Sequence, residues 1–194
     1  MITQYTYGVN TYASEKNNVI QMYKKWNAEE IRADLDPRRS KLVTIFENIN
    51  HNINISCAIR SNNAFLGNSV YVVGRHKLDR RGTVGTHHYE HVYYADTLDE
   101  VIDKLHDDGY YVYAVDNWPE YHPKNLIDTK LPEKSAFLFG EEQFGLSKAS
   151  IDKCDDMLYI QQFGSVRSMN VSCAASCIMY EYTKQWNQNK TCSK

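Results

Sequence analysis

No stretch of the chain is apolar for the roughly 20 consecutive residues that a membrane-spanning helix needs. The first ten residues, MITQYTYGVN, also lack the basic and then apolar order of a secretory signal peptide. These two absences argue against a membrane protein and against a secreted one. We therefore expect a protein of the cytoplasm that has no membrane partner.

Cysteine is scarce as well. The 194 residues include five cysteines, an odd number without paired spacing, which favours reduced thiols over a disulfide framework. Cys173 and Cys177 lie one turn apart in a segment of small and apolar residues near the C-terminus. We expect both to be small buried packing residues of a helix.

The chain lacks the strong positive charge of many RNA-binding proteins, because its formal net charge at pH 7 is −2. Local charge matters more than the total, and basic residues gather at 38–41 and at 75–81. Hydrophobic residues make up 42% of the chain and charged residues 24%, which is typical of a globular protein. A length of 194 residues suits one domain.

Apolar β-forming runs alternate with helical segments along the chain. Strands are expected at 42–48, 69–74, 91–94, 110–115, 135–139 and 157–161. Helices are expected at 19–35 (with a break near Asn27), 55–65, 97–108, 147–153 and 169–186. The remaining segments 75–91 and 116–134 are polar or rich in Gly and Pro, and we expect loops there. This alternation predicts an α/β fold, a mostly parallel sheet flanked by helices.

Two glycine-containing turns follow apolar strands in the last third of the chain. The first, 140–145, follows the strand predicted at 135–139, and the second, 164–170, follows the strand predicted at 157–161. Turns at the carboxyl ends of neighbouring parallel strands leave a crevice of exposed backbone N–H and C=O groups. Open α/β sheets bind nucleotide-like ligands in such a crevice.

Three ordered motifs resemble those of the SpoU (TrmH-type) RNA 2′-O-ribose methyltransferases, which belong to the SPOUT superfamily. The first is an Asn followed six residues later by an Arg, here Asn54 and Arg60. The second is G-x-E-x-x-G-L-S at 140–147, and the third runs from an Ile through a Gly turn into S-M-N-V-S-x-A at 160–174. The resemblance covers about residues 40 to 187, and three motifs in family order carry much more weight than one.

The resemblance implies a C-terminal deep trefoil knot and a homodimer with its two sites near the interface. It also implies a SpoU-like methyltransferase domain at 41–194 behind an N-terminal helical extension at 1–40, as one globular unit. The implied reaction is methyl transfer from S-adenosyl-L-methionine to a ribose 2′-hydroxyl of structured RNA, and it requires no metal. Among RNAs, tRNA is slightly favoured over rRNA because the chain is nearly a bare catalytic domain.

The same resemblance assigns roles to side chains. Arg60 would be the catalytic arginine, beside the target phosphate and the 2′-oxygen. A guanidinium with a pKa above about 12 is a poor base, so we expect it to stabilise the developing oxyanion. Asn54 would position Arg60 or begin the helix, and Glu142 would bond backbone or hold the arginine. Ser168 and Asn170 would cap the last helix or contact ribose, cofactor or Arg60.

Cofactor contacts in this family are largely made by the main chain. The resemblance places them at Val115, Gly140, Gly145, Ile160, Ser168 and Met169. The chain departs from the family pattern at Gln161-Gln162, where Pro-Met usually follows the Ile. The departure supports an alternative, a non-catalytic RNA-binding protein on a SPOUT scaffold. A dinucleotide-dependent oxidoreductase is disfavoured, because no G-x-G-x-x-G turn follows the first strand.

The segment His87-His88-Tyr89-Glu90-His91 holds several side chains of the metal-ligand type. It lies in a polar stretch without a companion cysteine. We therefore predict histidines that face solvent or RNA, and no metal site.

Overall fold

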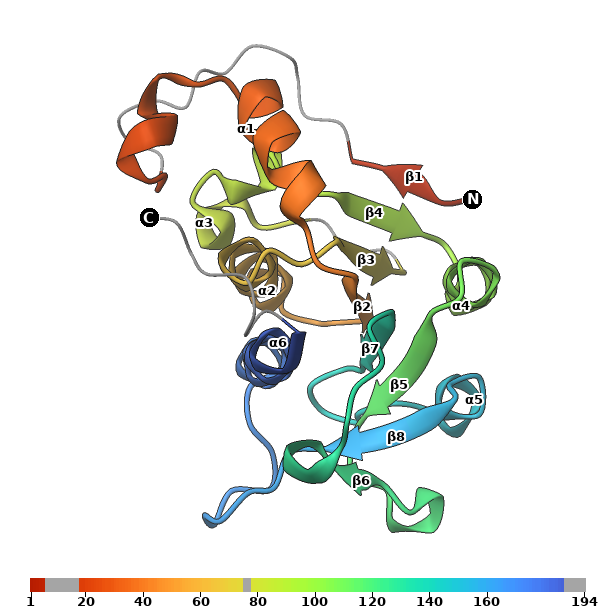
Figure 1. Ribbon diagram of the computed structural model, residues 1–194. Coiled ribbons are helices and arrows are strands. Elements are labelled where there is room, and N and C mark those ends of the chain that lie inside the picture. The colour runs from red at the N-terminus through yellow and green to blue at the C-terminus, as the bar shows by residue number, and fades with distance from the viewer. Residues whose placement is uncertain (6–17, 75–77, 187–194) are drawn as a thin grey trace.

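The computed structural model describes residues 1–5, 18–74 and 78–186. These residues form an eight-stranded sheet in the order β1-β4-β3-β2-β7-β5-β8-β6 (Figure 1). Every neighbouring pair is parallel except β1 and β4. The strands are β1 (Thr3–Gln4), β2 (Leu42–Glu47), β3 (Ser69–Val73), β4 (Val92–Ala95), β5 (Tyr111–Val115), β6 (Lys124–Asn125), β7 (Ser135–Phe139) and β8 (Asp156–Tyr159). The helices are α1 (Ala28–Leu35), α2 (Asn52–Ala64), α3 (Arg80–Thr83), α4 (Leu98–Asp107), α5 (Lys148–Ile151) and α6 (Val171–Trp186). The predicted α/β architecture is confirmed.

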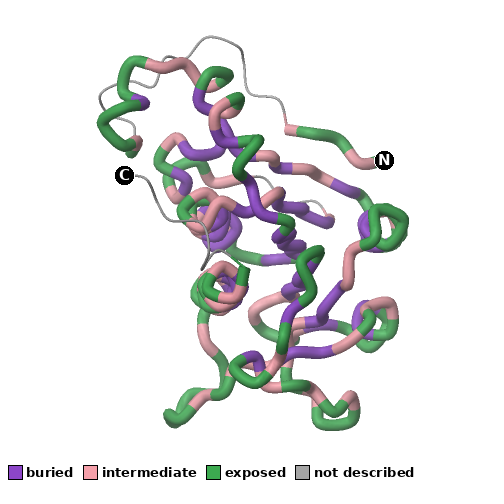
Figure 2. The backbone as a smooth tube through the Cα atoms, viewed as in Figure 1, coloured by how far each residue is buried: buried purple, intermediate pink, exposed green. Residues whose placement is uncertain are grey.

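Helices cover both faces of the sheet. In β2, Leu42 and Phe46 join the apolar cluster that packs against α2 and α6, whereas Val43 and Ile45 join the cluster that packs against α4 and α5. This is the two-residue alternation of a strand. Because both faces are buried, the central strands read as continuous apolar runs. Figure 2 shows the buried residues gathered along these strands, with exposed residues on the connecting loops.

The predicted break near Asn27 is present. A 3₁₀ turn spans Gln21–Lys25, and α1 begins at Ala28. The Asn27 side chain accepts a hydrogen bond from the Glu30 N–H at 2.9 Å, and the Glu30 carboxylate accepts one from the Asn27 N–H at 2.7 Å. This reciprocal pair satisfies two N–H groups that a helix start leaves without partners. The capping pattern therefore located the helix start correctly.

Other boundaries were wrong. α2 begins at Asn52, three residues before the predicted start, because its first turn is polar and gives no apolar periodicity. The segment 75–91 is more than a loop, since Asp79 accepts a hydrogen bond from the Arg81 N–H and caps the short helix α3. The segment 116–134 contains β6 and two 3₁₀ turns.

Two predictions about burial are also wrong. Cys173 and Cys177 are exposed, because α6 packs with the opposite face, which carries Ala175, Ile178 and Met179. A helix with a small-residue sequence can bury either side, so composition alone did not fix its rotation.

The histidine cluster does not lie uniformly on the surface. His87 is only 3% exposed and contacts the Thr83 hydroxyl, and this burial, with the positive charges of nearby His88 and Arg80, lowers the pKa of His87 to about 4. His91 instead bonds the carboxylate of Asp36. In the described part of the chain, no group of three or more His, Cys, Asp or Glu side chains is placed to hold a metal ion.

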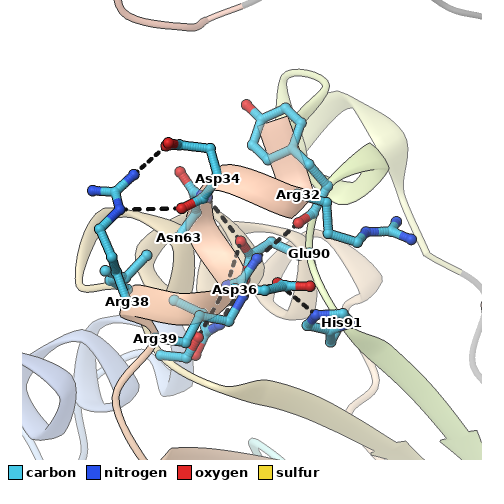
Figure 3. A network of polar contacts seen from close by, with 12 residues as sticks. Arg32, Asp34, Asp36, Arg38, Arg39, Asn63, Glu90 and His91 are labelled. Carbon is cyan, nitrogen blue, oxygen red and sulfur yellow. Dashed lines mark hydrogen bonds and ion pairs between the residues drawn. The ribbon is translucent and has the colours of Figure 1, made fainter. Parts of the chain in front are cut away.

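A buried ion pair attaches the segment before β2 to the segment before β4 (Figure 3). Arg39 Nη1 donates to Glu90 Oε1 at 3.0 Å, and the Glu90 carboxylate also accepts from the side-chain amides of Asn62 and Asn63 at 2.7 Å each. Burial raises the pKa of Glu90, and the Arg39 charge and the two amides oppose that shift. Arg39 is therefore not part of a basic surface.

Among the described residues, no helix has the length and apolar character to cross a bilayer.

Candidate functional site

A cavity of about 880 Å³ lies where β2, β5 and β7 end. It is lined by residues of α2, of the turn after β5, of the first glycine turn after β7, and of the second turn that leads into α6. The carboxyl ends of parallel strands in the middle of a sheet are the common ligand site of α/β folds. The volume suits a small-molecule cofactor, for which pockets of roughly 300–1,000 Å³ are typical.

The first glycine turn has backbone geometry that only glycine fits. The Gly145 N–H donates to the Glu141 carbonyl at 2.8 Å, which closes the turn, and Gly145 has a φ of +71°. A Cβ at Gly140 would lie 2.5 Å from the Gly145 carbonyl carbon. Asp116, which follows β5, accepts a hydrogen bond from the Leu146 N–H at 2.9 Å. The turn is therefore held tightly against the neighbouring strand, with its backbone facing the cavity.

A chain of hydrogen bonds joins all three sequence motifs at the cavity. Glu142 accepts from the Asn54 side chain at 2.7 Å and from the Asn50 N–H at 2.9 Å. The side-chain oxygen Oδ1 of Asn54 in turn accepts from the Asn170 side-chain amide at 3.0 Å. Burial opposes ionisation of Glu142, but the hydrogen bonds donated to it outweigh burial and hold its pKa below its ordinary value. Glu142 is therefore a carboxylate at neutral pH.

Asn170 also begins the last helix. Its side-chain oxygen accepts hydrogen bonds from the Ser172 N–H at 2.8 Å and from the Ser172 hydroxyl at 2.6 Å. This is the pattern of a helix N-cap. One asparagine thus fixes the start of α6 and, through Asn54, its position relative to α2.

The charge of the cavity is mainly negative. Four carboxylates line it: Asp116, Glu120, Glu141 and Glu142. Of these, only Glu120 makes an ion pair within the described chain, with Lys148 at 3.2 Å. Among the described residues that line the cavity, Arg167 is the one arginine or lysine. Such a lining suits a ligand that carries positive charge.

Residues 41–180 match the SpoU rRNA Methylase family. The chain belongs to this family. A tRNA (guanosine(18)-2′-O)-methyltransferase of Thermus thermophilus is 28% identical over 156 residues, which are 76% of this chain and 77% of that protein.

Solved structures of the family share the fold. The TrmH/SpoU tRNA modifying enzyme of A. aeolicus aligns with a TM-score of 0.72 at 22% identity, over 81% of each chain. The SpoU methyltransferase AviRb from Streptomyces viridochromogenes, in complex with the cofactor AdoMet, aligns with a TM-score of 0.68 at 25% identity. That alignment covers 80% of this chain and 62% of AviRb. The mostly parallel sheet with flanking helices is therefore the family fold.

Most of the predicted site residues of this SpoU methylase line the cavity. They are Asn54, Val115, Gly140, Glu142, Gly145, Ser168, Met169 and Asn170. Two are not among the lining residues. Ile160 packs against the apolar cluster under α2 and α6, and Arg60 is an exposed residue of α2. The departure at Gln161-Gln162 also lies outside the lining.

Helix geometry explains the position of Arg60. Arg60 is the sixth residue after Asn54, so it lies about 9 Å further along α2 and about 240° around its axis. Asn54 is 7% exposed and points into the protein, toward Glu142. Two residues with this spacing cannot face the same cavity from one regular helix. In a single protomer the two parts of the first motif are therefore on different sides of α2.

Several cavity residues were not predicted. Asp116 and Trp118 follow the predicted Val115, Phe144 stands inside the second motif, and Arg167 stands inside the third. All occupy variable positions of the motifs or lie just beyond them. The positions of the turns in the fold therefore add lining residues that the motif letters alone do not indicate.

Proposed function

We propose that this protein transfers a methyl group from S-adenosyl-L-methionine to a ribose 2′-hydroxyl of structured RNA, with tRNA slightly favoured over rRNA. The observation that carries the proposal is the hydrogen-bonded chain Glu142–Asn54–Asn170, which joins the three family motifs at one cavity. Family membership and the activities of the relatives support it. The tRNA preference rests on the relatives that act on tRNA.

The cavity fits the cofactor in size, charge and backbone. Its carboxylates complement a sulfonium and an ammonium group, and a Cβ at Gly140 would collide with the backbone that faces the ligand. Main-chain groups at Val115, Gly140, Gly145 and Met169 would hold the cofactor, whereas Ile160 would act only by packing beneath the site. When bound, the cofactor supplies a methyl group on a good leaving group. The residues around it hold the groups in line and exclude water.

Arg60 is proposed as the catalytic arginine, supplied by a partner subunit. A homodimer is supported by an exposed, mostly uncharged surface around Arg60. On α2 this surface contains Ile53 and Ala64, with the half-buried Cys57 between them, and on α6 it contains Cys173, Cys177 and Tyr180. The two helices are joined by a hydrogen bond between the Ser176 and Ser61 hydroxyls at 2.8 Å.

In that dimer the guanidinium would stabilise negative charge as it develops on the 2′-oxygen. A fixed positive charge at a reacting oxygen is worth about 10²–10³ in turnover. Glu142 would keep Asn54 and Asn170 in position, and Ser168 would contact the ribose or the cofactor. The 2′-proton would pass to water, because a guanidinium stays protonated and cannot accept it.

The proposed domain limits are 1–40 for a helical extension and 41–194 for the methyltransferase domain, and within the extension Thr3–Gln4 form β1 of the sheet. The start of the family match at residue 41 supports that boundary. The trefoil knot is likewise proposed, and the place of β7 between β2 and β5 supports it, because the chain must return to the middle of the sheet.

Methyl transfer from labelled cofactor to unfractionated tRNA and rRNA tests the activity. Arg60→Ala should lower turnover about 10²–10³-fold and leave cofactor affinity, measured by calorimetry, unchanged. A mixture of Arg60→Ala and Glu142→Ala protomers should regain activity, because one site of the mixed dimer then has an intact cavity and an intact partner arginine. No regain would contradict the shared site.

Calorimetry also tests the rival function. No heat at millimolar cofactor would support the non-catalytic RNA-binding protein instead. The Gln161-Gln162 departure, which first raised that alternative, lies outside the cavity lining and does not favour it.

A further inference from the structure

Arg167 lies in the loop between β8 and α6, which projects from the body of the molecule and is exposed along much of its length (Figures 1 and 2). Its side chain is exposed and also lines the cavity. It makes no hydrogen bond or ion pair with any residue that the structure describes. Its donors are therefore open to a ligand at the cavity mouth.

The charge around Arg167 raises a problem for an RNA substrate. Four carboxylates line the cavity, and each repels a phosphate that approaches the target ribose. Carboxylates suit the cationic cofactor but not the polyanion, so the site needs a cation on the side where RNA enters. In the same protomer Arg60 does not line the cavity, and the Arg60 proposed to come from a partner subunit would act at the reacting 2′-oxygen rather than at the cavity mouth.

Helix α6 adds to the positive potential at the mouth. It has sixteen residues and begins at Val171, four residues after Arg167, and both residues border the cavity. The N-terminus of a helix carries partial positive charge and favours anions. A guanidinium beside this end is unfavourable by itself and becomes favourable once an anion lies between them. The arrangement therefore fits an oxyanion.

We propose that Arg167 binds a backbone phosphate of the RNA next to the target ribose, which positions the 2′-hydroxyl over the cavity. This inference rests on the proposed function and adds a substrate-binding residue to it. The exposed place of Arg167 favours RNA phosphate over the cofactor carboxylate as the anion. A guanidinium can form two parallel hydrogen bonds to a phosphate, so it also fixes orientation.

RNA binding by Arg167→Gln tests the proposal, measured without cofactor on unfractionated tRNA over a series of salt concentrations. We expect about tenfold weaker binding and a slope of log K against log salt that is smaller by about 0.7 to 0.9, the loss of one phosphate contact. Arg167→Lys should restore the slope and only part of the affinity. Lys104→Ala is the matched control, since it removes a charge from α4 on the other face of the sheet.

Two further readouts separate the possible anions. Cofactor affinity by calorimetry should stay within about twofold in Arg167→Gln, and turnover at saturating RNA should fall much less than in Arg60→Ala. A loss of cofactor affinity with unchanged RNA binding would assign Arg167 to the cofactor and overturn the proposal. So would an unchanged salt slope. An inactive wild type would contradict the proposed function alone, because the RNA-binding measurements do not depend on methyl transfer.

Discussion

At each end of α2, asparagine side chains donate hydrogen bonds to a carboxylate, but the two carboxylates serve different purposes. At its C-terminal end the amides of Asn62 and Asn63 donate to Glu90, and at its N-terminal end the amide of Asn54 donates to Glu142. Glu90 is 1% exposed and has Arg39 as an ion-pair partner. Glu142 is only partly buried and makes no ion pair within the described residues.

The difference shows that burial and the presence of a counter-charge decide whether a carboxylate mainly affects the stability of the fold or is available to a ligand. A buried carboxylate without a cation is very costly, so Arg39 compensates a charge that the fold would otherwise bury alone. The Glu142 end leaves negative charge facing a cavity, which contributes less to the fold and is available to a cationic ligand. Substitutions around Glu90 should therefore mainly change the free energy of unfolding. Substitutions around Glu142 should mainly change ligand affinity.

The largest effect is expected at the buried end. Arg39→Ala leaves the buried Glu90 carboxyl group without its cation, and should lower the free energy of unfolding by about 3–5 kcal/mol. Arg38→Ala, which removes a half-exposed pair with Asp34, should cost about 0–1 kcal/mol. Urea unfolding measures both. Equal losses for the two variants would mean that the buried pair has no special weight.

The next effect is expected at the cavity. Gly140→Ala places a Cβ against the backbone of Gly145, so the turn must shift and cofactor affinity should fall about 100-fold. Gly164→Ala is the control in the other glycine turn, because a Cβ there meets nothing within 4 Å. It should leave both affinity and unfolding almost unchanged. Calorimetry decides, and a Gly140→Ala protein with normal cofactor affinity would refute the cofactor-binding turn.

The smallest effect concerns pH. The pKa of Glu142 is lowered, so its stabilising contribution is present above about pH 4.5, the ordinary Glu value, and is lost as pH falls through the folded pKa. The difference in unfolding free energy between wild type and Glu142→Gln, about 1 kcal/mol or less, should therefore shrink below pH 4.5.

The buried end should show the opposite trend. The pKa of Glu90 is raised, so the folded state holds the proton more tightly than the unfolded chain does. Wild type should gain stability relative to Glu90→Gln as pH falls through the folded pKa. Urea titrations between pH 3 and 7 measure both differences, and parallel curves for the two variants would contradict the comparison.

The sequence predicted the layers of the fold better than the details of the site. Apolar runs such as 135–139 bury both faces and are visible without tertiary information. The start of α2 could not be predicted from periodicity, because Asn52 and Asn54 are polar residues at positions where a helix pattern would need apolar ones. Asn54 is polar because it donates a hydrogen bond to Glu142 at the cavity. The rotation of α6, which exposes Cys173 and Cys177, depends on packing partners far away in sequence.

The site shows the same limit. The motif letters pointed to Glu142 and Asn170, and both line the cavity, because Glu142 lies in the turn after β7 and Asn170 at the start of α6. They did not show that Arg60 faces away from Asn54, which follows from six residues of helix. They also passed over Arg167, since its side-chain position depends on how the loop after β8 lies against the cavity.

The most direct test of ribose 2′-O-methylation is to determine which atom of the RNA carries the transferred methyl group. Labelled RNA from the methyl-transfer reaction would be hydrolysed in alkali, where a methylated 2′-oxygen cannot attack the adjacent phosphodiester. We predict that the label survives in an alkali-stable dinucleotide, and that Arg60→Ala removes it. Label found only in mononucleotides would place the methyl group on a base and contradict the account.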